Sequence, residues 1–167
     1  FISSRRLVRA GGARKRGRAG KAGWAGRLNT ARTLPDNPRM KNLRHEDLVA
    51  WQRADNLCVD IYRLTSRRFP TAERFGLVSQ LRRASYSVAA NIVEGFAFQS
   101  APTKLRYLRI AAGSLAEIGY GIHLATRLGY LSGHDVTDIQ QAGNQTGAPL
   151  HALIRKVAKE ARSHKVS

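Results

Sequence analysis

Apolar residues recur every three or four positions in three long segments of the chain. The first segment covers about residues 44–66 and ends at Phe69-Pro70, because the residue before a proline avoids the helical region. The second covers about residues 72–97. The third begins near Pro102 and ends at Leu128-Gly129, where glycine is a common helix stop. No segment alternates as a strand does, so the pattern predicts helices only.

A fourth helical segment begins after Ser132-Gly133 and has an interrupted middle. Its apolar positions continue to Val157, but Gly143, Gly147 and Pro149 fall between them. A proline inside a helix costs about 3 kcal/mol, so we expect a bend or a short gap between about residues 143 and 150. Four helices joined by short loops predict an all-α fold, an up-down-up-down four-helix bundle formed by residues 40–167.

Residues 1–39 differ in composition from the rest of the chain. They contain 11 basic residues and one acidic residue, Asp36, and show no sustained apolar periodicity. We expect a disordered basic N-terminal arm that contributes nothing to the core. Three interpretations stay open: sequence upstream of a translation start at Met40, which is the only methionine; an arm that binds RNA or DNA; or a transit peptide, rich in arginine and poor in acids.

The net charge of the whole chain is +18, of which residues 40–167 account for +8. Such an excess favours nucleic acid, other polyanions or anionic membranes as partners. No run approaches the ~20 apolar residues of a membrane helix, so we expect no membrane partner. The single cysteine, Cys58, excludes an intrachain disulfide and a multi-cysteine metal site. We therefore expect a cytoplasmic protein without a cofactor or metal.

A stripe of polar residues runs along the predicted second helix beside its apolar face. Gln80, Arg83, Ser87, Asn91 and Glu94 recur at spacings of three or four. One interpretation is a face exposed to solvent. The other is a hydrogen-bonding seam, within the bundle or between subunits, because serine and asparagine are poorer helix formers than the charged residues that usually cover an exposed face.

Five motifs of the chain match a known family in order and separation. They are HEDLVAWQRA (45–54), FP (69–70), ERFGLVSQLRRASYSVAANIVEG (73–95), AAGSLAE (111–117) and LGYL (128–131). Over most of residues 43–131 the chain resembles the four helix bundle proteins, also called 23S rRNA-intervening sequence proteins. The resemblance implies a four-helix subunit that assembles into a homopentamer. Some relatives are encoded within insertions in bacterial large-subunit ribosomal RNA genes, and distant relatives bind nucleic acid and a reverse transcriptase.

The resemblance places the polar stripe in the most characteristic motif of the family, which favours the hydrogen-bonding seam. Glu117, in AAGSLAE, is then a candidate opposite charge for Arg83. Such a pair specifies register more reliably than it adds stability. Glu94 and Glu117 lack the Glu-x-x-His pattern of metal-binding bundles, so we expect no catalytic residues and no metal site.

One end of the predicted bundle gathers most of the positive charge of residues 40–167. Four acidic residues lie nearby, and Tyr107 could add a stacking face. We predict that this end binds the backbone of RNA or DNA without reading its sequence. The alternatives are basic residues that only complement helix dipoles, and an oligomeric scaffold for a protein partner. The basic residues concerned are Lys41, Arg44, Lys104, Arg106, Arg109, Arg155, Lys156, Lys159, Arg162 and Lys165.

Overall fold

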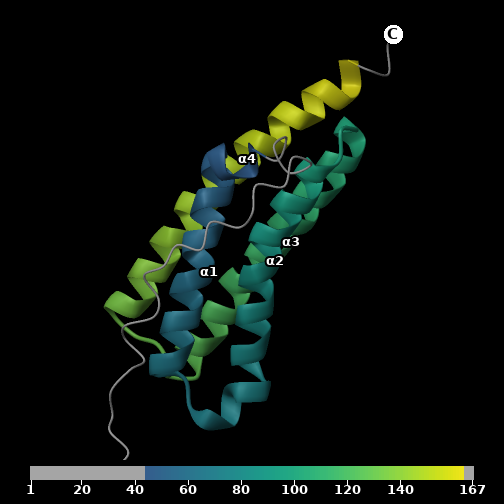
Figure 1. Cartoon of the computed structure of the whole chain (residues 1–167). Coiled ribbons are helices and arrows are strands. Elements are labelled where there is room, and N and C mark those ends of the chain that lie inside the picture. The colour runs from purple at the N-terminus through teal and green to yellow at the C-terminus, as the bar shows by residue number, and fades with distance from the viewer. Residues whose placement is uncertain (1–43, 164–167) are drawn as a thin grey trace, which may run out of the picture. The chain divides into compact units, whose positions relative to one another are not determined.

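The computed structural model describes residues 44–163, and all four predicted helices are present in this range (Figure 1). The helices are α1 (Val49–Arg68), α2 (Leu77–Ala97), α3 (Ala101–Arg127) and α4 (His134–Ser163). Residues 44–163 contain no strand, so the all-α fold is confirmed. The predicted arm at residues 1–39 lies outside the described residues, as do Lys41 and Lys165.

Helices α1 and α2 begin later than predicted, because a separate 3₁₀ turn precedes each of them. The first turn spans Arg44–Asp47, and Leu48 then adopts an extended conformation (φ −82°, ψ 117°) before α1. The second spans Thr71–Phe75 and ends at Gly76. The Glu73 carboxylate accepts a hydrogen bond from the Leu77 N–H at 2.9 Å, which caps the start of α2. Apolar spacing does not distinguish such turns from the helices they precede.

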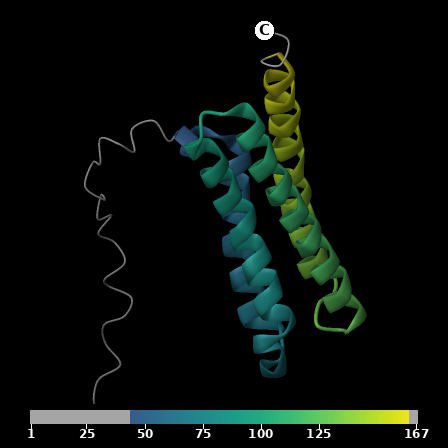
Figure 2. The ribbon, with the colours of Figure 1, turned by 90° about the vertical axis from the view of Figure 1, so that its right-hand side faces the viewer.

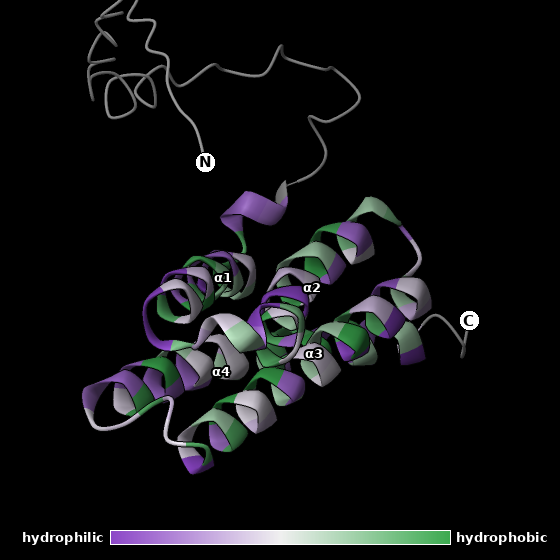
Figure 3. Ribbon diagram, turned by 90° about the horizontal axis from the view of Figure 1, so that it is seen from below, coloured by the Kyte–Doolittle hydropathy of each residue, from purple (hydrophilic) through white to green (hydrophobic). Residues whose placement is uncertain are grey.

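The core lies along the centre of the bundle, and every helix contributes fully buried side chains to it. Figure 3 shows the apolar sides of the helices facing one another. The predicted apolar seam of α3 is buried from Leu108 to Ala125, with Leu115 partly exposed. The largest side chains buried within the four helices are Leu57, Ile61, Leu81, Val88, Ile92, Leu108 and Leu150. None of the helices within residues 44–163 is long and apolar enough to cross a membrane.

Helix α4 continues through Gly143 and Pro149 without interruption, so the predicted gap is wrong. Burial on both sides of the proline explains the continuity. Thr146 and Leu150 are both 0% exposed, and the Thr146 hydroxyl donates to the Arg53 carbonyl of α1 at 3.2 Å. Packing therefore outweighs the proline cost of about 3 kcal/mol. Of the two predicted alternatives, a bend or a gap, only a bend is compatible with a continuous helix.

Each helix packs against two others: α1 and α3 each contact both α2 and α4 (Figure 2). One end of the bundle is held by polar contacts between distant segments. Arg68, at the end of α1, forms an ion pair of 2.9 Å with Asp135, at the start of α4. The Tyr130 hydroxyl, in the loop between α3 and α4, donates to Glu73 Oε1 at 3.1 Å.

Candidate nucleic-acid interface

A groove lies at the opposite end of the bundle, between the first turns of α3 and the last turns of α4. Its volume is about 620 Å³. Three arginines line it, Arg106 and Arg109 from α3 and Arg162 from α4. The structure therefore brings together three of the predicted basic residues from two segments more than 50 positions apart in the sequence. The remaining lining residues are Pro102, Leu105, Ile110, Ala158 and Ala161.

The three groove arginines are available to bind an anion. All three side chains are exposed, and none forms an ion pair with a carboxylate in the part of the chain that the structure describes. The ion pairs found there, Arg63–Asp60 and Arg68–Asp135, belong to other regions of the bundle. An arginine without a carboxylate partner presents its full set of N–H donors, which match a phosphate group bidentately.

Other predicted basic residues extend the positive charge away from the groove. Arg155, Lys156 and Lys159 are exposed on α4, and helical spacing puts Arg155 and Lys159 on the same face as Arg162. The Lys104 Nζ atom lies 5.5 Å from the centre of the Phe96 ring. Arg44 belongs to the 3₁₀ turn before α1.

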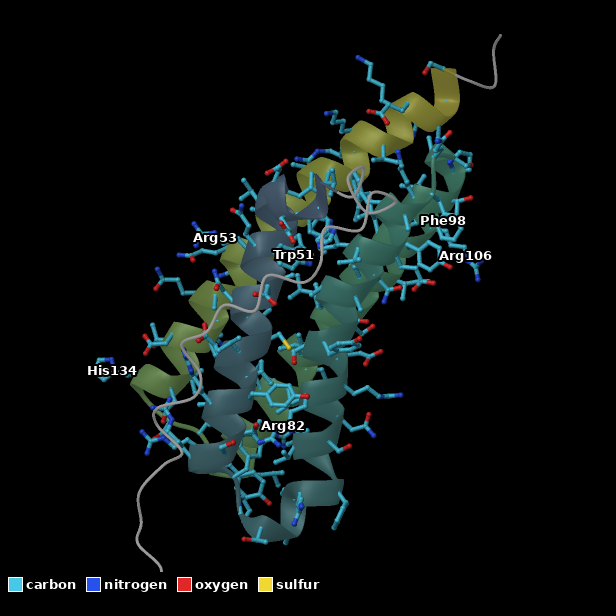
Figure 4. All side chains as sticks on the ribbon, viewed as in Figure 1. Trp51, Arg53, Arg82, Phe98, Arg106 and His134 are labelled. Carbon is cyan, nitrogen blue, oxygen red and sulfur yellow. The ribbon has the colours of Figure 1, made fainter. Side chains whose placement is uncertain are left out.

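Two aromatic side chains form a stack beside the groove: Phe98, which directly follows α2, and Tyr107 of α3. The rings of Phe98 and Tyr107 are nearly parallel, at 7°, with centres 5.5 Å apart. The Arg106 guanidinium lies 5.9 Å from the centre of the Tyr107 ring, and Figure 4 shows Phe98 and Arg106 on the same side of the bundle. A hydrogen bond to the Glu94 carboxylate, together with desolvation, raises the pKa of Tyr107 above its usual range.

Gly95 allows this stack to form, because it lets α2 and α3 approach closely. Gly95 is buried, and a Cβ atom there would lie only 3.1 Å from the Tyr107 Cβ and 3.4 Å from the Lys104 carbonyl oxygen. A larger residue at position 95 would press on the Tyr107 Cβ atom, so α3 would have to move away slightly. The close approach puts Tyr107 under the ring of Phe98, which directly follows α2.

The predicted polar stripe on α2 is divided between the interior of the bundle and its surface. Ser87 shares a hydrogen bond of 2.8 Å with the buried Ser114 of α3, and the Asn91 amide donates to the Ser87 carbonyl at 2.8 Å. The middle of the stripe therefore connects α2 to α3 within the chain. Gln80, Arg83 and Glu94 are exposed.

A comparison with protein families matches residues 46–152, more than half of the chain, to the 23S rRNA-intervening sequence protein model. The chain belongs to this family. The match includes α1, α2, α3 and much of α4, but Ala158, Ala161 and Arg162 of the groove lie beyond it. The family is not a known enzyme family. No curated protein matched the chain.

The family motif does not pair Arg83 with Glu117 inside this chain. The Arg83 guanidinium instead donates to Gln80 Oε1 at 2.7 Å, and no ion pair joins Arg83 to Glu117 within residues 44–163. Gln80 and Glu117 both line a second groove, which lies between α2 and α3 and has a volume of about 660 Å³. A pairing of Arg83 with Glu117 between subunits stays a prediction.

Sequence reasoning missed three residues whose contacts join neighbouring segments of the bundle. Phe98 was not expected to cover Tyr107, and Ser114 was not expected to meet Ser87. Arg82 was also missed, although it donates to Thr65 and Ser66 of α1, both at 2.9 Å.

Within the described residues, no group of three or more His, Cys, Asp or Glu side chains could hold a metal ion.

Proposed function

We propose that this 23S rRNA-intervening sequence protein is a non-catalytic, cytoplasmic, oligomeric bundle that binds RNA or DNA through its basic end. The observation that carries the proposal is the groove with Arg106, Arg109 and Arg162, three exposed arginines that have no carboxylate partner in residues 44–163. Arginines held on two neighbouring helices suit successive phosphates of a nucleic-acid backbone. In an oligomer, the groove is repeated once in every subunit.

Reversing the charge of the groove is expected to remove most of the salt-sensitive binding. The test uses the full chain with Arg106→Glu, Arg109→Glu and Arg162→Glu together, titrated against labelled RNA and duplex DNA at several salt concentrations. Each lost phosphate contact lowers the slope of log affinity against log salt by about 0.9 for duplex DNA. We expect the slope to fall by two to three such steps, and the affinity to fall at least about tenfold at low salt.

The matched control makes the same charge change away from the groove, with Arg67→Glu, Arg74→Glu and Arg127→Glu. These three arginines are exposed, and none lines the groove. Residues 1–39 are present in every variant, so a difference between the two triple variants reports on the groove alone. Equal binding by the two variants would contradict the proposal.

The second groove supports a second proposal, that α2 and α3 form the contact between subunits. Its lining is mainly apolar, and two large side chains there are unusually exposed: Tyr120 at 67% and Leu128 at 49%. Gly113 lies in the same groove, and a Cβ atom added there meets nothing within 4 Å. An apolar groove with small residues fits a helix of another subunit. The family resemblance sets the expected number of subunits at five.

Placing a charge in the second groove is expected to disrupt assembly. Ala116, on its α3 wall, is exposed, so Ala116→Arg leaves the core of the single chain intact while it buries a charge in the proposed interface. Light scattering should then report a mass near that of one chain. Ala152→Arg on the exposed side of α4 is the control. If both variants keep the mass of the unmodified protein, the contact between subunits lies elsewhere. The second groove would then fit better as a binding site for a protein partner, the alternative scaffold function.

A further inference from the structure

The residue that follows α2 presents an aromatic surface next to the arginine groove. Phe98 is 43% exposed although its ring stacks on Tyr107. Because Tyr107 covers one face of the Phe98 ring, the exposed area belongs to the other face and the edges. Phe98 also contributes little to the core, which the buried residues of the four helices already fill.

Arg106 connects this aromatic surface to the groove. Its guanidinium lies 5.9 Å from the Tyr107 ring centre, and the same side chain lines the groove with Arg109 and Arg162. A ligand that contacts Phe98 therefore has positive charge within reach on the groove side. Tyr107 adds no negative charge at neutral pH, because tyrosine has an ordinary pKa of about 10 and the hydrogen bond to the Glu94 carboxylate raises it further.

Part of the groove lining is apolar, which a site for phosphates alone does not require. Leu105 and Ile110 of α3 and Ala158 of α4 line the groove together with the arginines. In a duplex, neighbouring base pairs stack on one another and cover the faces of the bases, so a duplex offers this apolar lining and the Phe98 ring only base edges, sugar and phosphate. An unpaired strand offers exposed base faces together with phosphates, and base–aromatic stacking is a common source of its affinity.

We propose that the basic end binds single-stranded nucleic acid in preference to duplex, with one base stacked on the outer face of Phe98 and neighbouring phosphates bound by Arg106, Arg109 and Arg162. This inference rests on the proposed function and specifies its ligand. It assigns separate roles to the two kinds of residue. The arginines supply affinity for any phosphate backbone, and Phe98 supplies the preference for an unpaired strand.

The test compares an unstructured oligothymidine of about 20 nucleotides, longer than the ~4–16 nucleotides that one binding module covers, with a duplex of the same length at the same salt concentration. The full chain should bind the single strand more tightly. Phe98→Ala should lower the single-strand affinity about tenfold, the loss expected for one stacked base, and leave duplex affinity unchanged. Phe98→Trp, which keeps an aromatic surface, should retain the preference.

Phe75→Ala provides the matched control. Phe75 is 87% exposed in the 3₁₀ turn before α2, away from the groove, so its loss should not change either affinity. If Phe98→Ala reduces helix content, Phe98→Leu, which keeps apolar bulk without a ring, carries the same prediction. Equal affinity of the unmodified chain for both ligands, or equal effects of Phe98→Ala on both, would overturn this inference while the arginine variants still tested the proposed function. Failure of the arginine variants to weaken binding to either ligand would overturn the proposed function itself.

Discussion

Replacing Leu108 with alanine is expected to lower the free energy of unfolding by about 3 kcal/mol, within the 2–5 kcal/mol range of such core truncations. Leu108 is 0% exposed and belongs to the central apolar cluster. The substitution removes apolar contacts and leaves a cavity that the rigid helices cannot close. Urea denaturation followed by circular dichroism measures the change, at one fixed protein concentration because assembly also affects apparent stability.

Ile110→Ala, two positions further along α3, is the matched control. Ile110 is 41% exposed, so its truncation should cost less than about 1 kcal/mol. The two substitutions remove similar numbers of atoms from the same helix and differ in burial. If both cost the same, the boundary between core and surface on α3 is not where the structure puts it.

Replacing Pro149 with alanine is expected to stabilise the protein by about 1–3 kcal/mol. A proline inside a helix removes a backbone hydrogen bond and disfavours the helix by about 3 kcal/mol relative to alanine. Here α4 nevertheless continues from His134 to Ser163, so the substitution restores the N–H that the Gln145 carbonyl lacks. The greater freedom of the unfolded chain without proline offsets part of this gain, by about 0.4–1 kcal/mol. Thermal unfolding should show a higher midpoint.

Gly143→Ala tests the same helix without the proline effect. A Cβ atom at position 143 meets nothing within 4 Å, so the substitution should stabilise α4 by about 0.5–1 kcal/mol through helix propensity alone. Pro149→Ala should therefore exceed Gly143→Ala. A lower midpoint for Pro149→Ala would show that the assembled protein depends on the local shape that the proline imposes.

The number of helices and most of their apolar faces could be predicted from sequence, because each buried face repeats every three or four residues. The errors occurred where local chemistry and tertiary packing disagree. Around Pro149, propensity alone predicted a bend or gap, but the buried Thr146 and Leu150 hold the helix together. At Leu48 and Gly76, the apolar spacing continued through residues whose backbone leaves the helix.

The candidate site could be predicted only in part, for a related reason. Positive charge at the start of α3 and the end of α4 was visible in the sequence, and the groove brings Arg106, Arg109 and Arg162 together. The Phe98–Tyr107 stack could not be anticipated, because it depends on how closely two helices approach at Gly95. The search for an opposite charge also overlooked the partner that Arg83 has within its own helix, the side chain of Gln80.

The two ends of the bundle differ in how firmly their helices are held, which has a consequence for dynamics. Arg68–Asp135 and Glu73–Tyr130 fasten distant segments at one end. At the other end, the first turns of α3 and the last turns of α4 face each other across the groove, whose lining includes Leu105, Ala158 and Ala161. We expect local opening to begin in the last turns of α4, on the groove side, because the groove separates them from α3. A strand bound in the groove would contact this segment, so α3 and α4 could adjust their separation to the ligand while the rest of the bundle stays folded.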